Sequence, residues 1–375
     1  MTVEIRETRL GGNLRPFLEV VGDIYRNDPH YVRPLDFELK DRLDPKAPFW
    51  KHAEGTLLTA WRNGRCVGRC TAHIDREHLA RHKDGVGMFG LFDTTDDAEA
   101  AKALLDRAGE WVKRRGMKAL RGPLSLSVND ELGCLVEGFD TPPQVMMPHH
   151  RPYQGGLIEA AGLPKIKDLF AWQYEAGKLP ERARKGHAAI QAMPEVRCRP
   201  MDMKHLKRDV ALLMDIYNDA WSDNWGFVPM TRAEVDKLAS DMKLIAIPDL
   251  TQIVEIDGEA MAVAVALPNL NEALVGLDGK LLPTGLAKLV WRLKIRGVSS
   301  ARVIVLGIRR KLRNVRKYAA LSTFMYVQMH LSGARHGLRR GELSWTLEDN
   351  HAVNAGIKLM GGKVYKRYRL YQREL

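Results

Sequence analysis

The most densely charged stretch of this 375-residue chain directly follows an apolar run, Arg302 to Gly307. Six cations stand in nine residues: Arg309, Arg310, Lys311, Arg313, Arg316 and Lys317. The apolar run is typical of a buried strand, and apolar residues then recur at helical spacing as far as Gly337. We therefore predict a strand that feeds a helix opening at residue 309. Free backbone N–H groups, the helix dipole and these cations favour phosphate, so this turn is a candidate anion site.

A second group of reactive side chains ends another strand-like run, Leu124 to Glu131. Asp130 and Glu131 are candidates for the general base that removes a proton from an amine. About twenty residues, 132–151, then separate this run from the next predicted helix, and long loops at the carboxyl end of a sheet strand are often functional. We expect Asn129 and Phe139 to contact substrate there. The alternative is a lid that packs through apolar side chains.

A polar and aromatic loop interrupts a helical pattern at residues 221–229, with the sequence WSDNWGFVP. Asp223, Asn224 and Trp225 are candidate contacts for an acceptor substrate. The alternative is ordinary packing of the aromatic rings.

Three further motifs carry less chemistry. His205 and Asp209 fit an HxxxD spacing, but no partner motif accompanies them. His149 and His150 have no third ligand at metal-binding spacing, so a loop contact or solvent exposure is expected, and no metal site is predicted. The cations after Arg309 lack the aromatic or finger pattern of a nucleic-acid module, so no nucleic-acid partner is expected.

The elements around these residues occur twice along the chain. Leu124 to Glu131 (LSLSVNDE) and Leu343 to Asn350 (LSWTLEDN) both predict a strand that ends in an acidic cap. Asn-Gly at 63–64 and Asp-Gly at 257–258 each join two strand-like runs, which is a strong hairpin signal. We predict an α/β fold built from two similar halves, each with a mixed twisted sheet flanked by helices. Chance similarity between two α/β halves is the alternative.

Composition limits the class of protein. The chain is 45% hydrophobic and 28% charged, and its length favours two domains. A net charge of +12 indicates anionic partners. No signal peptide or membrane span is predicted, and the four cysteines have neither metal nor disulfide spacing. We expect a cytoplasmic protein, with a basic amphipathic helix at 281–297 that either rests on an anionic membrane or packs on the sheet.

The second half resembles the coenzyme-A-binding part of the GNAT acyltransferase superfamily. Asn350 and Gly361 match the family motif by spacing, whereas Ile357 stands where the family has a tyrosine. The glycines of the family's phosphate loop are also absent. The resemblance implies two GNAT folds in tandem and an acyl-CoA donor, with Tyr318 or Tyr365 as replacement for the missing acid.

Within that superfamily the chain resembles the bacterial ceramide synthases. The resemblance covers nearly the whole length, with its most specific strings at residues 122–147, 167–175, 223–229 and 342–371. It implies that a long-chain acyl group passes from acyl-CoA, or from an acyl carrier protein, to the amine of a sphingoid base, either sphinganine or its 3-oxo form. It also implies an N-terminal domain at 1–176, a connector at 177–194 and a C-terminal domain at 195–375 that binds the donor.

The site residues follow from this resemblance and from the chemistry of acyl transfer. Backbone N–H groups at Leu306, Gly307 and Ile308 are expected to hold the oxyanion. Glu131 or Asp130 serves as base, and Tyr318 as acid. The donor's phosphates are expected to contact Arg309, Arg310, Lys311, Arg313 and Asn350. Two other classes stay open: a Fem-like aminoacyltransferase, which uses aminoacyl-tRNA, and a non-enzymatic basic protein on the surface of the inner membrane.

Overall fold

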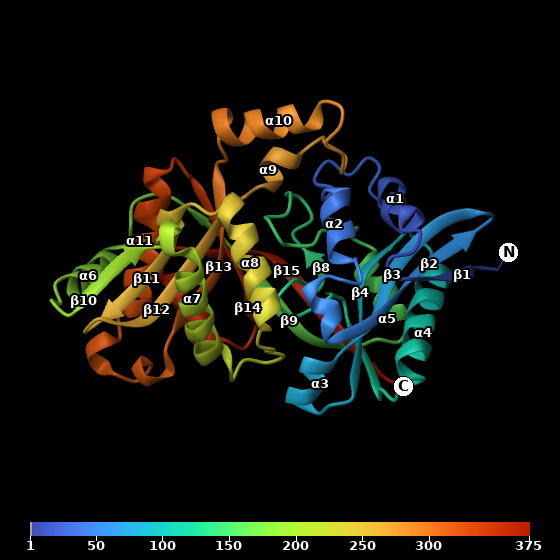
Figure 1. Cartoon of the computed structure of the whole chain (residues 1–375), viewed down its shortest axis with the longest axis horizontal. Coiled ribbons are helices and arrows are strands. Elements are labelled where there is room, and N and C mark those ends of the chain that lie inside the picture. The colour runs from blue at the N-terminus through green and yellow to red at the C-terminus, as the bar shows by residue number, and fades with distance from the viewer. Residues whose placement is uncertain (1) are drawn as a thin grey trace. The chain divides into compact units, whose positions relative to one another are not determined.

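The computed structural model describes residues 2–375, and the chain divides into two compact units (Figure 1). Unit 1 comprises the chain up to Leu169 together with Ala273–Trp291 and Lys366–Leu375. Unit 2 comprises Phe170–Glu272 and Arg292–Tyr365. The units are therefore interleaved in sequence.

The sheet of unit 1 is antiparallel except at one central pair. Its strands, in spatial order, are β1 (Glu4–Arg9), β2 (Ala53–Arg62), β3 (Arg65–Asp75), β4 (Val86–Thr94), β5 (Ala119–Gly122) and the part of β15 (Lys363–Glu374) that belongs to this unit. Strands β4 and β5 are parallel. Strand β8 (Cys134–Glu137) pairs with β15 at Arg367–Arg369, so the end of the chain completes the sheet of unit 1.

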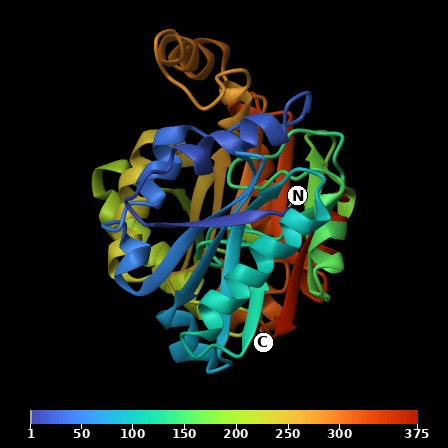
Figure 2. The ribbon, with the colours of Figure 1, turned by 90° about the vertical axis from the view of Figure 1, so that its right-hand side faces the viewer.

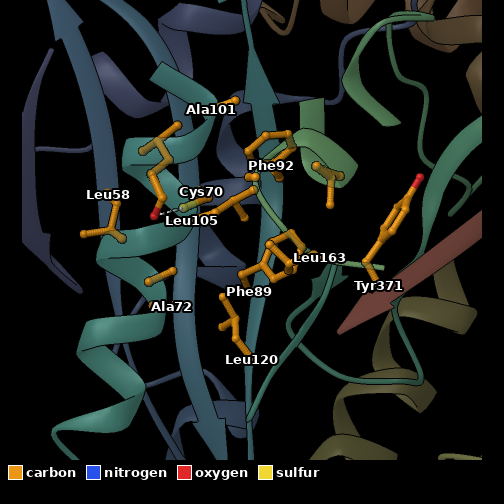
Figure 3. Close-up of a cluster of buried hydrophobic side chains, with 14 of the residues drawn as sticks. Leu58, Cys70, Ala72, Phe89, Phe92, Ala101, Leu105, Leu120, Leu163 and Tyr371 are labelled. Carbon is orange, nitrogen blue, oxygen red and sulfur yellow. Dashed lines mark hydrogen bonds between the residues drawn. The ribbon is translucent and has the colours of Figure 1, made fainter. Parts of the chain in front are cut away.

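Helices cover the sheet of unit 1 because their apolar faces match its core. They are α1 (Arg15–Ile24), α2 (Asp36–Arg42), α3 (Arg76–His82), α4 (Ala98–Lys113) and α5 (Gln154–Ala160). Figure 2 shows α4 lying across the strands. The Asp97 carboxylate caps α4 by accepting a hydrogen bond from the Ala100 N–H at 3.0 Å. Leu105 then packs with Phe89 and Phe92 of β4 in the core drawn in Figure 3.

Unit 2 repeats this order of elements. Its strands are β10 (Val196–Pro200), β11 (Thr251–Ile256), β12 (Glu259–Pro268), β13 (Ser300–Ile308) and β14 (Arg340–Leu347), beside the second part of β9 (Lys165–Glu175). Strands β13 and β14 form the parallel pair. The main helices are α6 (Glu181–Gln191), α7 (Leu206–Trp221), α8 (Arg232–Ile245), α11 (Leu321–Arg335) and α12 (His351–Leu359). The predicted connector thus contains α6, which buries Ala183 and Ile190.

The predicted fold class, α/β with mixed sheets flanked by helices, is confirmed. Both predicted hairpins form, and their turns need the left-handed backbone that Asn or Asp followed by Gly provides, with φ of 52° and 75° at Asn63 and Gly64. Other predicted elements were wrong. The helix expected at residue 309 begins only at Leu321, because the chain first makes two short 3₁₀ turns at Arg310–Leu312 and Arg316–Tyr318.

Candidate active site

The parallel strands of unit 2 separate part-way along their length. The β13–β14 ladder ends at the pair Val303 and Leu343, although β13 continues to Ile308 and β14 to Leu347. In the β12–β13 ladder, Val265 pairs with Val305 but Ala266 pairs with Val303, so Ile304 is a one-residue bulge. We call the opening between the separated ends of β13 and β14 the unit 2 slot.

The walls of the unit 2 slot are apolar and partly open. Val303, Ile304, Val305 and Leu306 are all half-buried, although they lie in a central strand. On the β14 side Trp345 and Thr346 are also half-buried. The sequence predicted a strand here correctly but predicted burial on both faces, which is wrong for these residues. An apolar opening at the carboxyl ends of parallel strands is where α/β sheets bind ligands.

Two helices bound the slot on the α7 face of the sheet. Ile304 and Val305 pack against the core formed by α7 and α8. Trp221, the last residue of α7, meets Trp345 edge-on with ring centroids 6.0 Å apart. The opposite wall differs, because Val303 and Leu306 pack toward α11 and α12.

Unit 1 has the corresponding pair of strands, but the opening between them is closed. The β4–β5 ladder ends at Met88 and Arg121, and Leu91, with φ of 45°, lies at a bulge in β4. The backbone of Leu124 passes so close to Gly90 that any Cβ atom there would overlap its carbonyl group. The Leu91 N–H donates to Ser125 Oγ at 3.4 Å, and all of β4 is buried.

A break in the predicted strand produces this closure. Leu124 to Glu131 was expected to form one strand, as its counterpart β14 does. Instead β6 (Leu124–Ser125) lasts two residues, and Leu126 takes φ of 98° before the chain turns back into β7 (Glu131–Leu132). In unit 1, Leu124 and Ser125 therefore fill the space that corresponds to the slot of unit 2.

The cations beyond β13 all belong to the described part of unit 2, and most face carboxylates. Arg309 pairs with Asp215, Arg310 with Asp219 and Asp223, Lys311 with Glu259, and Lys317 with Glu195. Arg313 donates to the Ala220 carbonyl oxygen. The Arg310–Asp223 pair is exposed, with 50% and 66% of the two side chains open to solvent. Ion pairs of that exposure contribute at most about 1 kcal/mol, so a stronger anion can displace the carboxylate.

The backbone positions predicted to hold an oxyanion lie along the slot. Leu306, Gly307 and Ile308 follow the bulge and pair with Ala264, Val263 and Ala262 of β12. Gly307 is needed for close packing, since a Cβ atom there would lie 3.2 Å from the Ala220 Cβ atom. Tyr318, the predicted acid, donates its hydroxyl to Glu195 at 3.3 Å.

The aromatic loop predicted to contact the acceptor follows directly from α7. Asp223 is exposed and faces Arg310, with a closest nitrogen–oxygen distance of 3.3 Å. Asn224 and Trp225 are half-buried. The loop ends at a capping box, in which Thr231 and Glu234 each bond to the other's backbone N–H at the start of α8. Asn350 caps α12 by accepting from the Val353 N–H at 3.3 Å.

The predicted carboxylates of the first half gather around one arginine in unit 1. Arg42 lies 3.6 Å from Glu131 and 3.9 Å from Asp130. Burial works against the charged guanidinium, but these two carboxylates outweigh it and raise the pKa of Arg42. Asp130 also accepts from the Ser127 hydroxyl at 3.0 Å, while Asn129 donates its backbone N–H to the same hydroxyl. Phe139 is half-buried in the 132–151 insertion.

Sequence reasoning missed a buried polar cluster in unit 2. Glu342 of β14 is 1% exposed and accepts hydrogen bonds from the hydroxyl groups of Ser344 and Tyr365. Arg302 of β13 donates to Ser344 Oγ at 2.7 Å, and its Nε atom lies 3.7 Å from Glu342. The available signal was a charged residue inside each strand, Arg302 in β13 and Glu342 in β14.

Comparison with known proteins shows two full-length relatives. The chain is 41% identical over 366 residues to "Bacterial ceramide synthase" of Caulobacter vibrioides (strain NA1000 / CB15N), covering 96% of this chain and 95% of the relative. It is 36% identical over 363 residues to "Protein YghO" of Escherichia coli (strain K12), with 97% and 93% covered. No protein-family model matches the chain.

The chain belongs to the bacterial ceramide synthase family. Its fold is similar to that of a tandem GNAT protein from the clavulanic acid biosynthesis pathway, with a TM-score of 0.59 at 12% identity over 99% of this chain and 98% of that one. A GCN5-related N-acetyltransferase from Sphaerobacter thermophilus gives a TM-score of 0.54, also at 12% identity, with 99% and 95% covered. The predicted tandem GNAT fold is confirmed, and this family member is an N-acyltransferase.

The next features concern membrane-spanning helices and metal-binding side chains among the described residues. None of the helices within residues 2–375 is both long enough and apolar enough to cross a membrane. Over the same residues, no three His, Cys, Asp or Glu side chains are arranged to hold a metal ion.

Proposed function

We propose that the protein transfers a long-chain acyl group from acyl-CoA to the amine of a sphingoid base, either sphinganine or 3-oxosphinganine. The relative in Caulobacter carries the name of that activity and matches over nearly the whole chain. The observation that carries the proposal is the open apolar slot of unit 2, set against the closed pair of strands in unit 1.

The donor is assigned to unit 2 on this contrast. A thioester and its pantetheine arm need an extended apolar channel, and only the unit 2 slot, among the described residues, offers one between separated parallel strands. The Leu306 and Ile308 N–H groups are assigned to the developing oxyanion. N–H groups alternate in direction along a strand, and because the Arg309 N–H donates to Met261 of β12, the Gly307 N–H points to β12 as well. The donor-binding domain is therefore unit 2, which contains most of the predicted 195–375, and unit 1, which contains most of 1–176, is the second GNAT-like domain.

The phosphates of the donor are assigned to the cations beyond β13. Arg310 and Lys311 are half-exposed. Arg310 is held by the half-buried Asp219 and the exposed Asp223, and Lys311 by the exposed Glu259, so phosphate can replace Asp223 and Glu259 at little cost. Arg309 is less open, with 17% of its side chain exposed, and Arg313 is tied to a carbonyl group. Charge-assisted bonds to phosphate are stronger than these exposed pairs, which makes the exchange favourable.

The acceptor is assigned to the α7 face of the slot, where Trp221, Trp225 and Trp345 provide aromatic surface. Asp223 and Asn224 at the rim suit the hydroxyl and ammonium groups of a sphingoid base. The roles of Asn129 and Phe139 remain predictions from the sequence.

Contact with an anionic membrane surface is part of this proposal, because both substrates are lipids. The segment from Gly279 to Ser300 holds five Lys or Arg residues and no Asp or Glu. It includes α10 (Gly285–Trp291), followed by a π-helical turn at Arg292–Arg296. Leu282, Trp291 and Ile295 are 78%, 55% and 73% exposed. Exposed apolar residues among cations, with a tryptophan, are typical of an interfacial helix.

Vesicle flotation tests this membrane contact. We expect the protein to float with phosphatidylglycerol vesicles and not with phosphatidylcholine vesicles, and we expect Trp291→Ser with Ile295→Ser to weaken flotation. The matched control is Phe37→Ser, which removes an apolar side chain of similar exposure, 58%, from α2. Equal flotation of all three proteins would contradict the assignment of this segment.

The acyl transfer itself is tested with purified protein, palmitoyl-CoA and either sphinganine or 3-oxosphinganine. Mass spectrometry should detect the N-palmitoyl product and free CoA in equal amounts. Parallel incubations with palmitoyl-acyl carrier protein and with aminoacyl-tRNA distinguish the other donors. Product from aminoacyl-tRNA alone would replace this proposal with a Fem-like activity, and no product from any donor would leave the non-enzymatic membrane-surface protein.

A further inference from the structure

We infer that Glu342, acting through the hydroxyl group of Ser344, receives the proton that the acceptor amine loses during acyl transfer. This inference rests on the proposed N-acyl transfer and deepens it, by assigning the proton acceptor to unit 2. The sequence had pointed to Glu131 and Asp130 of the first half.

The position of the cluster supports the assignment. Arg302 and Glu342 face each other in the β13–β14 ladder, one residue before it ends at Val303 and Leu343. Ser344 is the first residue of β14 beyond the ladder, so the cluster lies at the closed end of the unit 2 slot. A thioester that lies along the slot with its nucleotide toward residue 309 places its carbonyl group between Leu306 and this end.

The cluster also lies on the acceptor side of the sheet. Side chains two residues apart in a strand point to the same face, so Arg302 points with Ile304 toward α7. Ser344 accepts a hydrogen bond from Arg302, and Glu342 lies beside Arg302, so both are on that face as well. An amine that enters beside Trp221 and Trp345 therefore approaches Ser344.

The hydroxyl oxygen of Ser344 has one lone pair that can accept a hydrogen bond from the amine. A serine hydroxyl has one proton and two lone pairs. Ser344 donates its proton to Glu342 and accepts one hydrogen bond from Arg302 Nε at 2.7 Å. Its second lone pair remains for an N–H of the substrate. Tyr365 of β15 donates to the other carboxylate oxygen and so holds Glu342 in place from the side of β14 away from β13.

The step balances without any further reactant. The lone pair of the neutral amine forms the C–N bond, and the carbonyl π electrons move onto oxygen. The positively charged nitrogen of this adduct passes a proton to Ser344 as Ser344 passes its own proton to Glu342. The C–S bond then breaks, the sulfur leaves with the bonding pair, and the thiolate takes the proton from Glu342 back through Ser344. Amide and thiol result.

Arg302 has a positioning role in this arrangement. Its guanidinium holds Ser344 through two bonds, to the hydroxyl and to the carbonyl oxygen at 3.2 Å. It also neutralises a carboxylate that is almost fully buried, which would otherwise be costly.

The test compares three carboxylate variants in one assay: Glu342→Gln, Glu131→Gln and Asp209→Asn. Asp209 is the matched control, because it is also about 1% exposed in unit 2 and is paired with an arginine, Arg199, at 2.7 Å. We expect Glu342→Gln to lower kcat about 100-fold, the low end for general base catalysis, while KM for acyl-CoA stays within about twofold. Asp209→Asn should keep kcat within about threefold, and the loss in Glu342→Gln should exceed any loss in Glu131→Gln.

Two further measurements separate chemistry from folding. Ser344→Ala removes the relay but leaves Glu342, Arg302 and Tyr365 in place, so it should lower kcat with a melting temperature near that of the wild type. The loss in Glu342→Gln should also shrink for 3-oxosphinganine relative to sphinganine, because the less basic amine gives an adduct that loses its proton more readily.

Several outcomes would overturn the inference while wild-type turnover keeps the proposed function. They are wild-type kcat in Glu342→Gln, a kcat loss confined to Glu131→Gln, and equal losses in Glu342→Gln and Asp209→Asn that follow their melting temperatures. Absence of product from the wild-type protein would instead remove the proposed function.

Discussion

Reversing the charge of Arg310 tests the phosphate assignment. Arg310 faces Asp223 at 3.3 Å and Asp219 at 3.5 Å, and half of its side chain is exposed. A hydrogen bond between charged groups contributes roughly 1.5–3 kcal/mol, and this exposure places the contact at the lower end. Loss of about 1.5 kcal/mol corresponds to about a tenfold weaker interaction. Arg310→Glu should therefore raise KM for acyl-CoA about tenfold, with kcat little changed.

The matched control is Arg232→Glu on α8. Arg232 belongs to the same unit, is exposed, and pairs with Asp236 at 3.4 Å in the same way that Arg310 pairs with Asp223. Its reversal changes the net charge by the same amount, so it should alter KM by less than about twofold. The assay is initial-rate kinetics in donor concentration at low and at high salt, because salt weakens interactions between exposed charges, with a Debye length of about 8 Å at physiological ionic strength.

The result that refutes the reasoning is equal behaviour of the two variants. If Arg310→Glu and Arg232→Glu raise KM alike, the effect is one of net charge, and the phosphates bind elsewhere. A tenfold difference that persists unchanged at high salt would also contradict a contact made at this exposed position.

Three other perturbations follow from the geometry. Asp223→Asn frees Arg310 from its competing carboxylate and should lower KM for acyl-CoA by up to about fivefold, as expected for an exposed pair; a raised KM would show that Asp223 helps to hold substrate. Gly90→Ala should lower the melting temperature, because the added Cβ atom would overlap the backbone of Leu124. Gly156→Ala should not, because nothing lies within 4 Å of the added Cβ atom there. Equal melting temperatures of the two variants would mean that the strands of unit 1 are not closed as described. Burial lowers the pKa of both His73 and His150 to about 4 in the folded protein, whereas the same side chains have a pKa of 6.5 in the unfolded chain. The unfolded chain therefore binds more protons between these values, and stability should fall as pH decreases from about 6.5 toward 4. His73→Gln should flatten that decline in a pH series of thermal melts, and an unchanged slope would show that His73 does not cause it.

Local patterns were sufficient to predict much of the fold. Alternating and apolar runs located β2, β3, β11 and β12, and the two hairpin turns depend on the residue pairs that tolerate a positive φ. The similarity between the two halves was also visible, because each half must bury the same faces of similar elements. These features depend on residues that are close in sequence.

The errors concern features that depend on residues distant in sequence. No local signal shows that Leu124 passes against Gly90, so one strand breaks where its counterpart continues. The cations after β13 suggested a helix terminus, but their carboxylate partners on α7 hold them in 3₁₀ turns instead. The interleaving of the units, in which Lys366–Leu375 completes the sheet of unit 1, likewise follows from strand pairing alone.

Distance in sequence also limited the prediction of the candidate site. Leu306, Gly307 and Ile308 lie in β13 beyond the end of the β13–β14 ladder, and their part in holding the oxyanion stays a prediction. Glu342 was overlooked because a carboxylate in an apolar strand gives no indication of its partners, and Arg302 is forty residues earlier in the sequence. Ligand chemistry needs groups brought together by the sheet, which a reading of consecutive residues does not supply.

The most direct test of the central claim is a crystal structure of the protein with a thioether analogue of palmitoyl-CoA, which binds but cannot transfer its chain. The account predicts that the pantetheine arm lies between β13 and β14, with its phosphates at Arg310 and Lys311. Density for the analogue against β4 of unit 1, or outside the separated strands of unit 2, would contradict it.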